Sequence, residues 1–318
     1  MRLNLKVIAV IVSIAILALL VVYADPAKFA SIVAKSDIRL LLAALAVSTI
    51  SILLRAVKWK VFFDDVKFAD IVPVQILGLT ISNFSPGKIG EPAKAVILKM
   101  KNGQAVSSTL PSIVWERILD VLVLLILAII SLYSFTHIGR KFYIISIAAT
   151  AVFVVLLAIG VLVLYSKRFC NSFFNFIRKL PVLNRISKSF IETFQKTRIK
   201  KRKLVYCFIF TALAWILEGF IMHYAFLSIG VSLDPFVLAS IFALATMIGI
   251  ATVLPGGLGS TDVVLTILLS YLGVETAVAI TGILLARFLS IWYLNLLGGI
   301  SFVNLSRKLN INMKSILK

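Results

Sequence analysis

Charged and chemically reactive side chains are scarce in this sequence of 318 residues. It holds two cysteines, two histidines and 13 acidic residues, and only 14% of its residues are charged. Soluble domains carry about 25% charged residues, so this composition excludes a soluble enzyme. The same composition excludes a secreted disulfide scaffold, and the two cysteines, which have no metal-ligating neighbours, are interpreted as free thiols. We therefore expect neither a metal site nor a cofactor.

Apolar residues dominate what is present. Hydrophobic residues make up 61% of the chain, its mean hydropathy is +1.06, and 33 basic residues give it a formal charge of +20. The basic residues alternate with long apolar runs and form no separate soluble domain, so we expect no nucleic-acid partner. The composition predicts an all-α, polytopic integral membrane protein whose residues 1–318 form a single membrane domain.

Six apolar runs reach the length of about 20 residues that a helix needs to cross a bilayer. Two other apolar regions are interrupted by Pro-Gly sequences. Region 71–99 is broken at Ser85-Pro86-Gly87, and region 236–272 is broken at Pro255-Gly256-Gly257-Leu258-Gly259. Such pieces are too short to span separately, and each region is predicted to be a re-entrant hairpin. The six predicted full spans are 7–23, 38–57, 112–135, 142–165, 204–228 and 277–304.

The first of these segments has two interpretations. Arg2 and Lys6 precede an apolar run, and Val22-Tyr23-Ala24 resembles a signal-peptidase site, as in a cleaved export signal. We favour an uncleaved anchor, because polytopic proteins commonly begin with one.

The distribution of positive charge predicts the orientation. Residues 166–203 hold twelve Lys or Arg and one acid, so the positive-inside rule makes this segment a basic cytoplasmic loop. The basic N-terminus and the tail 305–318 follow the same rule, which places both termini in the cytoplasm and the protein in the cell membrane. Hairpin 71–99 then opens on the cytoplasmic side and hairpin 236–272 on the outer side.

The two interrupted regions share a pattern. A Pro-Gly-x-x-Gly sequence begins at Pro86 and again at Pro255, and an intramembrane arginine follows at a matching distance, Arg117 and Arg287. Because the charge distribution gives the two units opposite orientations, they form a predicted inverted repeat, which points to a transporter binding site near the midplane. The repeated units are 38–135 and 204–304. Their break and hinge residues are Pro86, Gly87, Gly90, Pro255, Gly256, Gly257 and Gly259.

Ionisable residues within apolar segments are costly, at least ~2.5–3.5 kcal/mol each on insertion scales, and are therefore functional candidates. Glu116 and Asp120 share one helix face, with Arg117 within pairing reach of Asp120. Either these charges only neutralise one another and lock the helix to the hairpin, or the cations bind an anionic headgroup that the acids orient. The predicted substrate-binding residues are Lys88, Glu91, Lys94, Glu116, Arg117, Asp120, Asp262 and Arg287.

Other polar residues in the second unit have simpler expected roles. Ser260, Thr261 and Asp262 follow Gly259 and are natural N-caps for a helix over 263–272. Glu218 lies within an apolar span, where Arg287 is an expected partner. No catalytic constellation is visible, since the sequence lacks a nucleophile elbow, a zinc-protease motif and a phosphate loop. We therefore expect no enzymatic activity.

The ordered motifs resemble a known family. Asn83-Phe-Ser-Pro-Gly-Lys-Ile-Gly-Glu-Pro-Ala-Lys, Trp115-Glu-Arg-Ile-Leu-Asp and Leu254-Pro-Gly-Gly-Leu-Gly, followed by Arg287, are similar to the flippase-like membrane region of lysylphosphatidylglycerol synthases and to the stand-alone UPF0104 proteins. Two positions depart from that pattern, with Lys88 in place of Arg and Asp262 in place of Glu. We expect no aminoacyl-transferase domain like that of the synthases, so the resemblance implies lipid translocation without lysyl transfer.

These observations favour a transporter or flippase for an anionic phospholipid or a polyprenyl-linked lipid, with the headgroup held between the broken hairpins. The alternative is a non-catalytic membrane subunit that anchors or assists a glycosyltransferase or lipid synthase, with the basic loop as its docking surface. A membrane glycosyltransferase using Glu91 or Asp262 as base is a third, less favoured hypothesis, because no metal-binding acid pair stands at a membrane surface.

Overall fold

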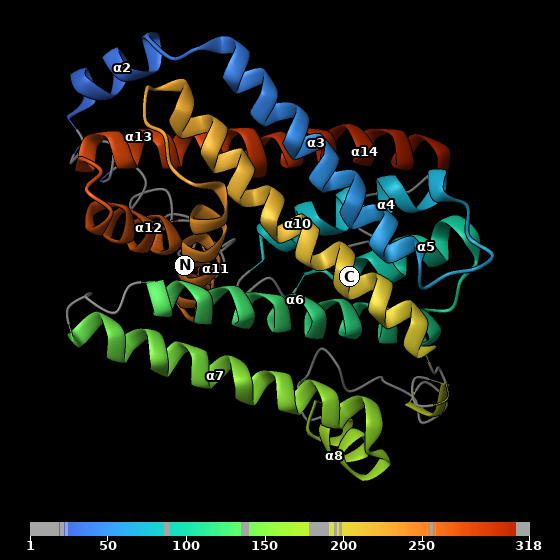
Figure 1. Cartoon of the computed structure of the whole chain (residues 1–318). Helices are drawn as coiled ribbons and strands as arrows, with labels where there is room; N and C mark the ends of the chain where they lie inside the picture. The colour runs from blue at the N-terminus through green and yellow to red at the C-terminus, as the bar shows by residue number, and fades with distance from the viewer. Residues whose placement is uncertain are drawn as a thin grey trace, which may run out of the picture.

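The structure is a computed structural model, and all its regular secondary structure is helical in the residues that it describes (Figure 1). This confirms the predicted all-α class. The described residues are 25–85, 90–134, 140–177, 199–252 and 259–309, together with 19, 22, 191–193, 196, 254 and 257.

The helices follow one another with short connections, apart from the basic segment after α8. A π-helical turn, η1, interrupts the last long helix. The elements are α2 (Pro26–Ala34), α3 (Ile38–Lys60), α4 (Phe68–Asn83), α5 (Ala93–Asn102), α6 (Val106–Ser134), α7 (Arg140–Tyr165), α8 (Lys167–Ile177), α10 (Lys201–Ser228), α11 (Pro235–Ala251), α12 (Ser260–Tyr271), α13 (Thr276–Arg287), η1 (Phe288–Trp292) and α14 (Tyr293–Leu309).

Local chemistry sets several helix ends. Asp37 precedes α3 and accepts the Arg39 backbone N–H at 2.8 Å, and Asp234 precedes α11 and accepts two backbone N–H groups of its first turn. Short acidic side chains at such positions satisfy donors that have no partner within the helix. Gly103 ends α5 with a φ of 74°, a conformation that glycine adopts without steric cost.

The predicted segments recur in the structure with small shifts at their ends. Segments 38–57, 112–135, 142–165 and 204–228 correspond to α3, α6, α7 and α10, and segment 277–304 corresponds to α13, η1 and α14. Both interrupted regions are two helices separated by a break, α4 with α5 and α11 with α12. Segment 7–23 lies outside the described residues except for positions 19 and 22, and so does the question of its cleavage.

Length and hydropathy suit three described helices to crossing a membrane: Ile38–Lys60, Lys201–Ser228 and Thr276–Arg307. A fourth span arises if Thr150–Val163 and Lys167–Phe173 are joined across their 110° bend. Helix α6 is long enough as well, but it carries three charged residues close together. The number of six full spans therefore stays a prediction.

The helices of the two predicted units pack reciprocally. Helices α3 and α10 contact each other along much of their length and cross the molecule side by side (Figure 1). Helix α4, which opens the broken region of the first unit, packs on α14, the last helix of the second. Helix α11, its counterpart in the second unit, packs on α6, the last helix of the first. Each broken region therefore lies against the other unit.

Polar contacts join segments that the charge distribution places on the same side. At one end, the Asp37 N–H donates to the Ser228 carbonyl at 2.8 Å, and Lys28 pairs with Glu275. At the other end, Lys203 pairs with Asp64 at 2.8 Å. Lys101 of α5 pairs with Asp70 of α4 at 3.0 Å, so this broken region begins and ends at the same end of the molecule. Which end faces the cytoplasm stays a prediction.

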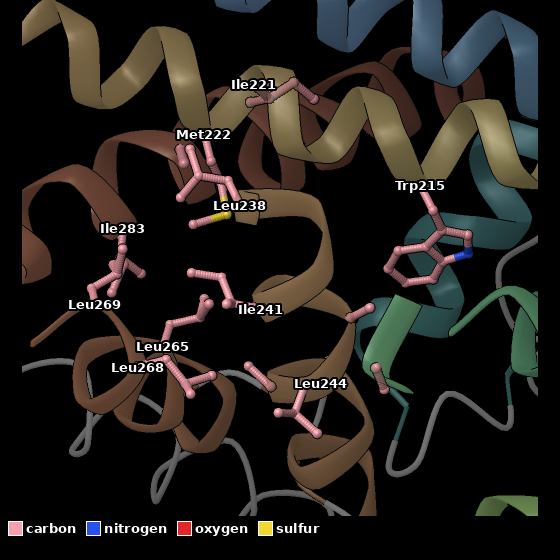
Figure 2. Close-up of a cluster of buried hydrophobic side chains, with 14 of the residues drawn as sticks. Trp215, Ile221, Met222, Leu238, Ile241, Leu244, Leu265, Leu268, Leu269 and Ile283 are labelled. Carbon is pink, nitrogen blue, oxygen red and sulfur yellow. The ribbon is translucent and has the colours of Figure 1, made fainter. Parts of the chain in front are cut away.

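Buried apolar side chains of the described residues form two main cores. Side chains of α10, α11, α12 and α13 converge in the larger core, in which Met222, Leu238 and Leu268 are 3% exposed or less (Figure 2). A second core joins α3, α4 and α5 around Trp59 and Ile71. Both cores bury the apolar faces of the short broken helices, which lack the length to be stable alone.

Two glycines allow close helix contacts. A Cβ added to Gly219 of α10 would lie 2.2 Å from the Pro235 carbonyl of α11, and one added to Gly298 of α14 would lie 2.1 Å from the Thr80 hydroxyl of α4. Small residues permit such approaches between membrane helices. These contacts hold each broken region against a long helix.

Candidate functional site

Six charged side chains form a closed ring of alternating sign at the first broken region. They come from α3, from α5 with its preceding turn, and from α6. Going around the ring, each cation contacts two carboxylates and each carboxylate contacts two cations. The order is Lys58, Glu116, Lys94, Glu91, Arg117, Asp120 and back to Lys58.

The ion pairs of the ring are short. Lys58 lies 3.3 Å from Glu116 and 3.1 Å from Asp120, and Lys94 lies 2.8 Å from Glu91 and also pairs with Glu116. Arg117 closes the ring at 2.8 Å from Glu91 and 2.6 Å from Asp120. Since breaking a buried ion pair costs about 3–5 kcal/mol, the complete ring holds α3, α5 and α6 together.

Uncharged groups complete the surroundings of Lys94. Its ammonium donates to the Gln75 carbonyl oxygen at 3.1 Å and lies 4.5 Å from the centre of the Trp59 ring. The Gln75 amide in turn donates to Glu116 at 3.3 Å, and the Trp59 indole donates to Ser112 at 3.1 Å. The buried lysine is therefore satisfied on every side by charge, amide and aromatic face.

Arg117 differs from the other five members of the ring. Its side chain is 38% exposed, whereas those of the others are 5% exposed or less. Both of its carboxylate partners also contact a lysine, Glu91 contacting Lys94 and Asp120 contacting Lys58. Arg117 can therefore turn toward another anion without leaving either carboxylate unpaired.

The second broken region carries a smaller ion pair. The Arg287 Nε donates to Asp262 Oδ1 at 2.6 Å, and the arginine lies over the Phe242 ring at 5.3 Å. The other carboxylate oxygen of Asp262 accepts the Gly259 backbone N–H at 2.9 Å. Asp262 thus fixes the start of α12 and the position of Arg287 together.

Two sequence expectations for this region were wrong. Helix α12 begins at Ser260, so neither Ser260 nor Thr261 is its N-cap; Gly259 is, and Asp262 reaches back to it from the first turn. Glu218 pairs with Arg55 at 3.1 Å and leaves Arg287 to Asp262, which is closer along the chain. The break before α12 brings Asp262 within hydrogen-bond distance of Arg287.

Sequence reasoning missed Arg55 and Lys58 as site residues. Arg55 lies near the end of the predicted span 38–57 and Lys58 just beyond it, and neither is among the predicted site residues. Helix α3 continues to Lys60, and it brings Arg55 to Glu218 and Lys58 into the ring. The spacing of polar residues in this segment could have indicated both residues. Ser48, Ser51, Arg55 and Lys58 lie three or four residues apart, which puts them on one face of a helix.

A cavity of about 870 Å³, including its open mouth, lies between the two units. Three arginines reach it, Arg55, Arg117 and Arg287, and so do the carboxylates of Asp120 and Glu218. Its lining comes from α3, α4, α6, α10, α11, α12, α13, η1 and α14. Among the uncharged residues that line it are Ser48, Ser51, Ser82, Asn83, Thr246, Thr261 and Ser290.

Besides Arg117, whose Nε has an ion-pair contact with Glu91, four residues that line this cavity have a buried polar atom without a hydrogen-bond partner. These atoms are Ser51 Oγ, Thr246 Oγ1, Trp215 Nε1 and Arg287 Nη2, on residues that are 2–6% exposed. Nearly all buried polar groups in proteins are paired, so a cluster of unpaired donors calls for an explanation. All four can donate a hydrogen bond, and donors suit an oxyanion.

Among the residues that the structure describes, the charged groups around the cavity balance one another. Five cations and five carboxylates take part in the ring, in the Arg55–Glu218 pair and in the Arg287–Asp262 pair. The sum of these charges is zero. The cavity thus offers hydrogen-bond donors and guanidinium groups without a net positive charge.

The predicted site residues divide into two groups in space. Glu91, Lys94, Glu116, Arg117 and Asp120 all belong to the ring, whereas Asp262 and Arg287 form the second pair. The Arg117–Asp120 contact that the sequence offered as a purely structural alternative is present in the ring. Of these seven residues, Arg117, Asp120 and Arg287 line the cavity. Lys88 lies outside the described residues.

The described break residues have conformations suited to glycine. Gly257 and Gly259 have φ values of 68° and 85°. The Gly90 N–H donates to the Ser85 hydroxyl at 2.7 Å, and a Cβ on Gly90 would lie 2.9 Å from the Ile81 carbonyl. Pro86, Gly87, Pro255 and Gly256 lie outside the described residues.

Within the described part of the chain, no group of three His, Cys, Asp or Glu residues could hold a metal ion.

The sequence matches known proteins over nearly its whole length. Residues 8–298 match the family described as the lysylphosphatidylglycerol synthase TM region. The chain belongs to this family. A UPF0104 membrane protein of Pyrococcus horikoshii is 26% identical over 96% of this chain and 99% of its own length. Another, from Methanothermobacter thermautotrophicus, is 25% identical over 92% of this chain and 93% of its own.

A third relative, from Methanocaldococcus jannaschii, is 24% identical over 72% of this chain and 95% of its own length, and it too is a UPF0104 membrane protein. Membership in the lysylphosphatidylglycerol synthase TM family makes the chain a member of a lipid-related group of membrane proteins. It confirms the resemblance read from the three motifs and the multi-pass membrane character read from the composition.

Proposed function

We propose that this member of the family is a transporter that moves an anionic phospholipid or a polyprenyl-linked lipid across the cell membrane. The observation that carries the proposal is the cavity between the two units. Three arginines line it, and so do buried hydrogen-bond donors that have no partner in the protein, one of which belongs to Arg287. A phosphate or phosphodiester group accepts hydrogen bonds on several oxygens at once and satisfies such a cluster.

We also propose that residues 38–135 and 204–304 are inverted repeats. The reciprocal packing of α4 on α14 and of α11 on α6 supports this, because a two-fold relation exchanges these two contacts. In transporters with such repeats, one unit rocks against the other around a central site and opens it to each side in turn. The headgroup site proposed here lies between units of this kind.

The proposal assigns orientation and chemistry from the sequence. Both termini face the cytoplasm, as the positive charge of residues 166–203 and of the C-terminal tail indicates. The chain binds and moves its lipid and performs no covalent chemistry on it, since the sequence holds no catalytic constellation. The lipid is the proposed partner, and the proposal requires no cofactor.

Vesicles containing the purified protein test the proposal. Fluorescent phosphatidylglycerol is placed in both leaflets, and dithionite added outside bleaches the outer leaflet; lipid that moves outward is bleached later. We expect the protein to accelerate this second phase over protein-free vesicles. A fluorescent phosphatidylcholine serves as the neutral-headgroup comparison and is expected to move more slowly. Equal rates with and without protein, for a phosphatidylglycerol probe and for a polyprenyl phosphate probe, would contradict the proposal.

The unpaired donors allow a sharper test. Ser51→Ala with Thr246→Val removes two hydroxyl groups that no protein atom bonds, so a structural role predicts unchanged or slightly raised stability. A binding role predicts at least a tenfold slower phosphatidylglycerol movement, equivalent to about 1.4 kcal/mol. The matched control is Thr281→Val, which removes an equally buried hydroxyl that bonds the Ala277 carbonyl away from the cavity.

A further inference from the structure

The ring of six charges suggests how lipid binding is coupled to an ion. On the basis of the proposed function, we propose that Arg117 leaves the ring to bind the anionic headgroup and that Asp120 takes up one proton in its place. The structure supports this in three steps: the freedom of Arg117, the absence of a spare cation among the described neighbours, and the position of Asp120 on the cavity.

Arg117 is the one cation of the ring placed to contact a ligand in the cavity. It lines the cavity, and its side chain is 38% exposed, while Lys58 and Lys94 are buried and do not line it. Guanidinium groups bind phosphate oxygens in a bidentate fashion. When Arg117 turns to the headgroup, Glu91 keeps Lys94 and Asp120 keeps Lys58.

The charge balance changes when Arg117 is withdrawn. The neutral ring becomes three carboxylates with two ammonium groups, which is a net charge of −1 in a buried site. The charge of Arg117 now neutralises the headgroup. An uncompensated buried charge costs several kcal/mol, and such groups bind a proton instead of remaining charged.

No described cation near Asp120 is free to compensate this charge. From α3, Lys58 lies 3.1 Å away and already serves Glu116, and Arg55 is held by Glu218 of α10 at 3.1 Å. From α13, Arg287 is held by Asp262. On α6 itself, the remaining charged neighbour is Glu116, which adds negative charge. A proton is therefore the compensating cation.

Asp120 is the carboxylate that this proton reaches. It lines the cavity, so water in the cavity can deliver a proton, whereas Glu91 and Glu116 are 1% exposed or less and do not line it. Once Asp120 is neutral, the remaining members alternate again as Lys58, Glu116, Lys94 and Glu91. Two cations and two carboxylates then remain, and every charge is paired. One proton is bound for each monoanionic headgroup.

Proton uptake is measured directly in a weakly buffered solution with a pH-indicator dye. The detergent-solubilised full chain is titrated with dihexanoyl phosphatidylglycerol, whose headgroup stays monoanionic at neutral pH. We expect about one proton taken up per lipid bound, and a tenfold weaker affinity for each unit rise in pH, as linkage requires. Dihexanoyl phosphatidylcholine, which brings no net charge, is expected to cause no uptake.

Variants assign the proton to its residue. Asp120→Asn is expected to bind the lipid without proton uptake, with less than a twofold change in affinity per pH unit. Asp64→Asn, an exposed residue outside the ring, is the matched control and is expected to keep the uptake. Asp120→Ser removes the same carboxylate and leaves the same charges in the ring, so it provides the same measurement if Asp120→Asn fails to fold.

The outcomes separate the two proposals. Lipid binding by the unmodified chain without proton uptake overturns the coupling and leaves the transport proposal standing. Uptake that persists in the folded Asp120 variants overturns the assignment to this residue. If the unmodified chain binds no anionic lipid, neither phosphatidylglycerol nor a polyprenyl phosphate, the transport proposal fails and the coupling fails with it.

Discussion

Replacing Lys94 with methionine tests whether the ring of six charges is a structural unit. Lys94 is fully buried and pairs with Glu91 and Glu116, and Gln75 accepts a further hydrogen bond from it. In Lys94→Met the ring holds three carboxylates and two cations. We expect a loss of about 3–5 kcal/mol in the free energy of unfolding, which is the cost of removing one partner from a buried ion pair.

A second substitution restores the charge balance. In Lys94→Met with Glu116→Gln, the remaining members Lys58, Asp120, Arg117 and Glu91 alternate in sign and stay in contact. We expect the double variant to be about 2 kcal/mol more stable than Lys94→Met alone, because it leaves no buried charge without a partner.

The assay is reversible unfolding of the purified protein in mixed micelles with increasing dodecyl sulfate, followed by circular dichroism. The single variants and the double variant form a double-mutant cycle. The control is Lys28→Met, which removes a lysine from an exposed ion pair and is expected to cost 1 kcal/mol or less. Additive losses in the cycle, with the double variant less stable than either single one, would refute the view that charge balance holds this region together.

Three further predictions concern the framework around the site. Asp234→Ala removes the N-cap of α11 and is expected to cost about 1 kcal/mol in the same unfolding assay, whereas Asp234→Ser is expected to restore most of it. Gly298→Val forces a side chain into Thr80 and is expected to lower the thermal midpoint, with partial recovery when Thr80→Ala is added; no recovery would contradict the close contact of α14 with α4. The hydrogen bond from Lys203 holds the pKa of Asp64 below its ordinary value, so this pair stabilises the fold above the ordinary aspartate pKa and loses that effect as pH falls through the lowered pKa. Carboxyl NMR is expected to show the Asp64 midpoint rising in Lys203→Met, and an unchanged midpoint would remove the pair as its cause.

The helices were predictable because membrane insertion constrains them strongly. Apolar runs of about 20 residues predict α3, α7 and α10 to within a few residues, and Pro-Gly sequences predict the breaks after α4 and α11. The π-helical turn after Arg287 was not predictable. It depends on how the last long helix packs against α3 and α10, which hydropathy does not encode.

Most of the charged residues of the site were predictable from the sequence, but the partners with which they form ion pairs were less so. Glu91, Lys94 and Asp120 were found because charge is rare inside apolar segments. Lys58 was missed because the positive-inside rule explains a lysine near a helix end equally well. Partners far apart in sequence, such as Arg55 with Glu218, depend on the packing of α3 against α10, and one sequence contains no information on that packing.

The described charged groups around the cavity sum to zero, and this bears on how a transporter releases its lipid. A cavity with three unpaired arginines would bind a phosphate tightly and hold it, because the anion would be the sole partner of each cation. In this structure every arginine on the cavity already has a carboxylate partner, so a headgroup must compete with Asp120 and Glu91 for Arg117. The same carboxylates can reclaim the guanidinium when the lipid leaves, which lowers the free-energy cost of release. Transport needs binding that is favourable enough to load the site and weak enough to empty it, and exchange of one arginine between two carboxylates and a phosphate meets both requirements.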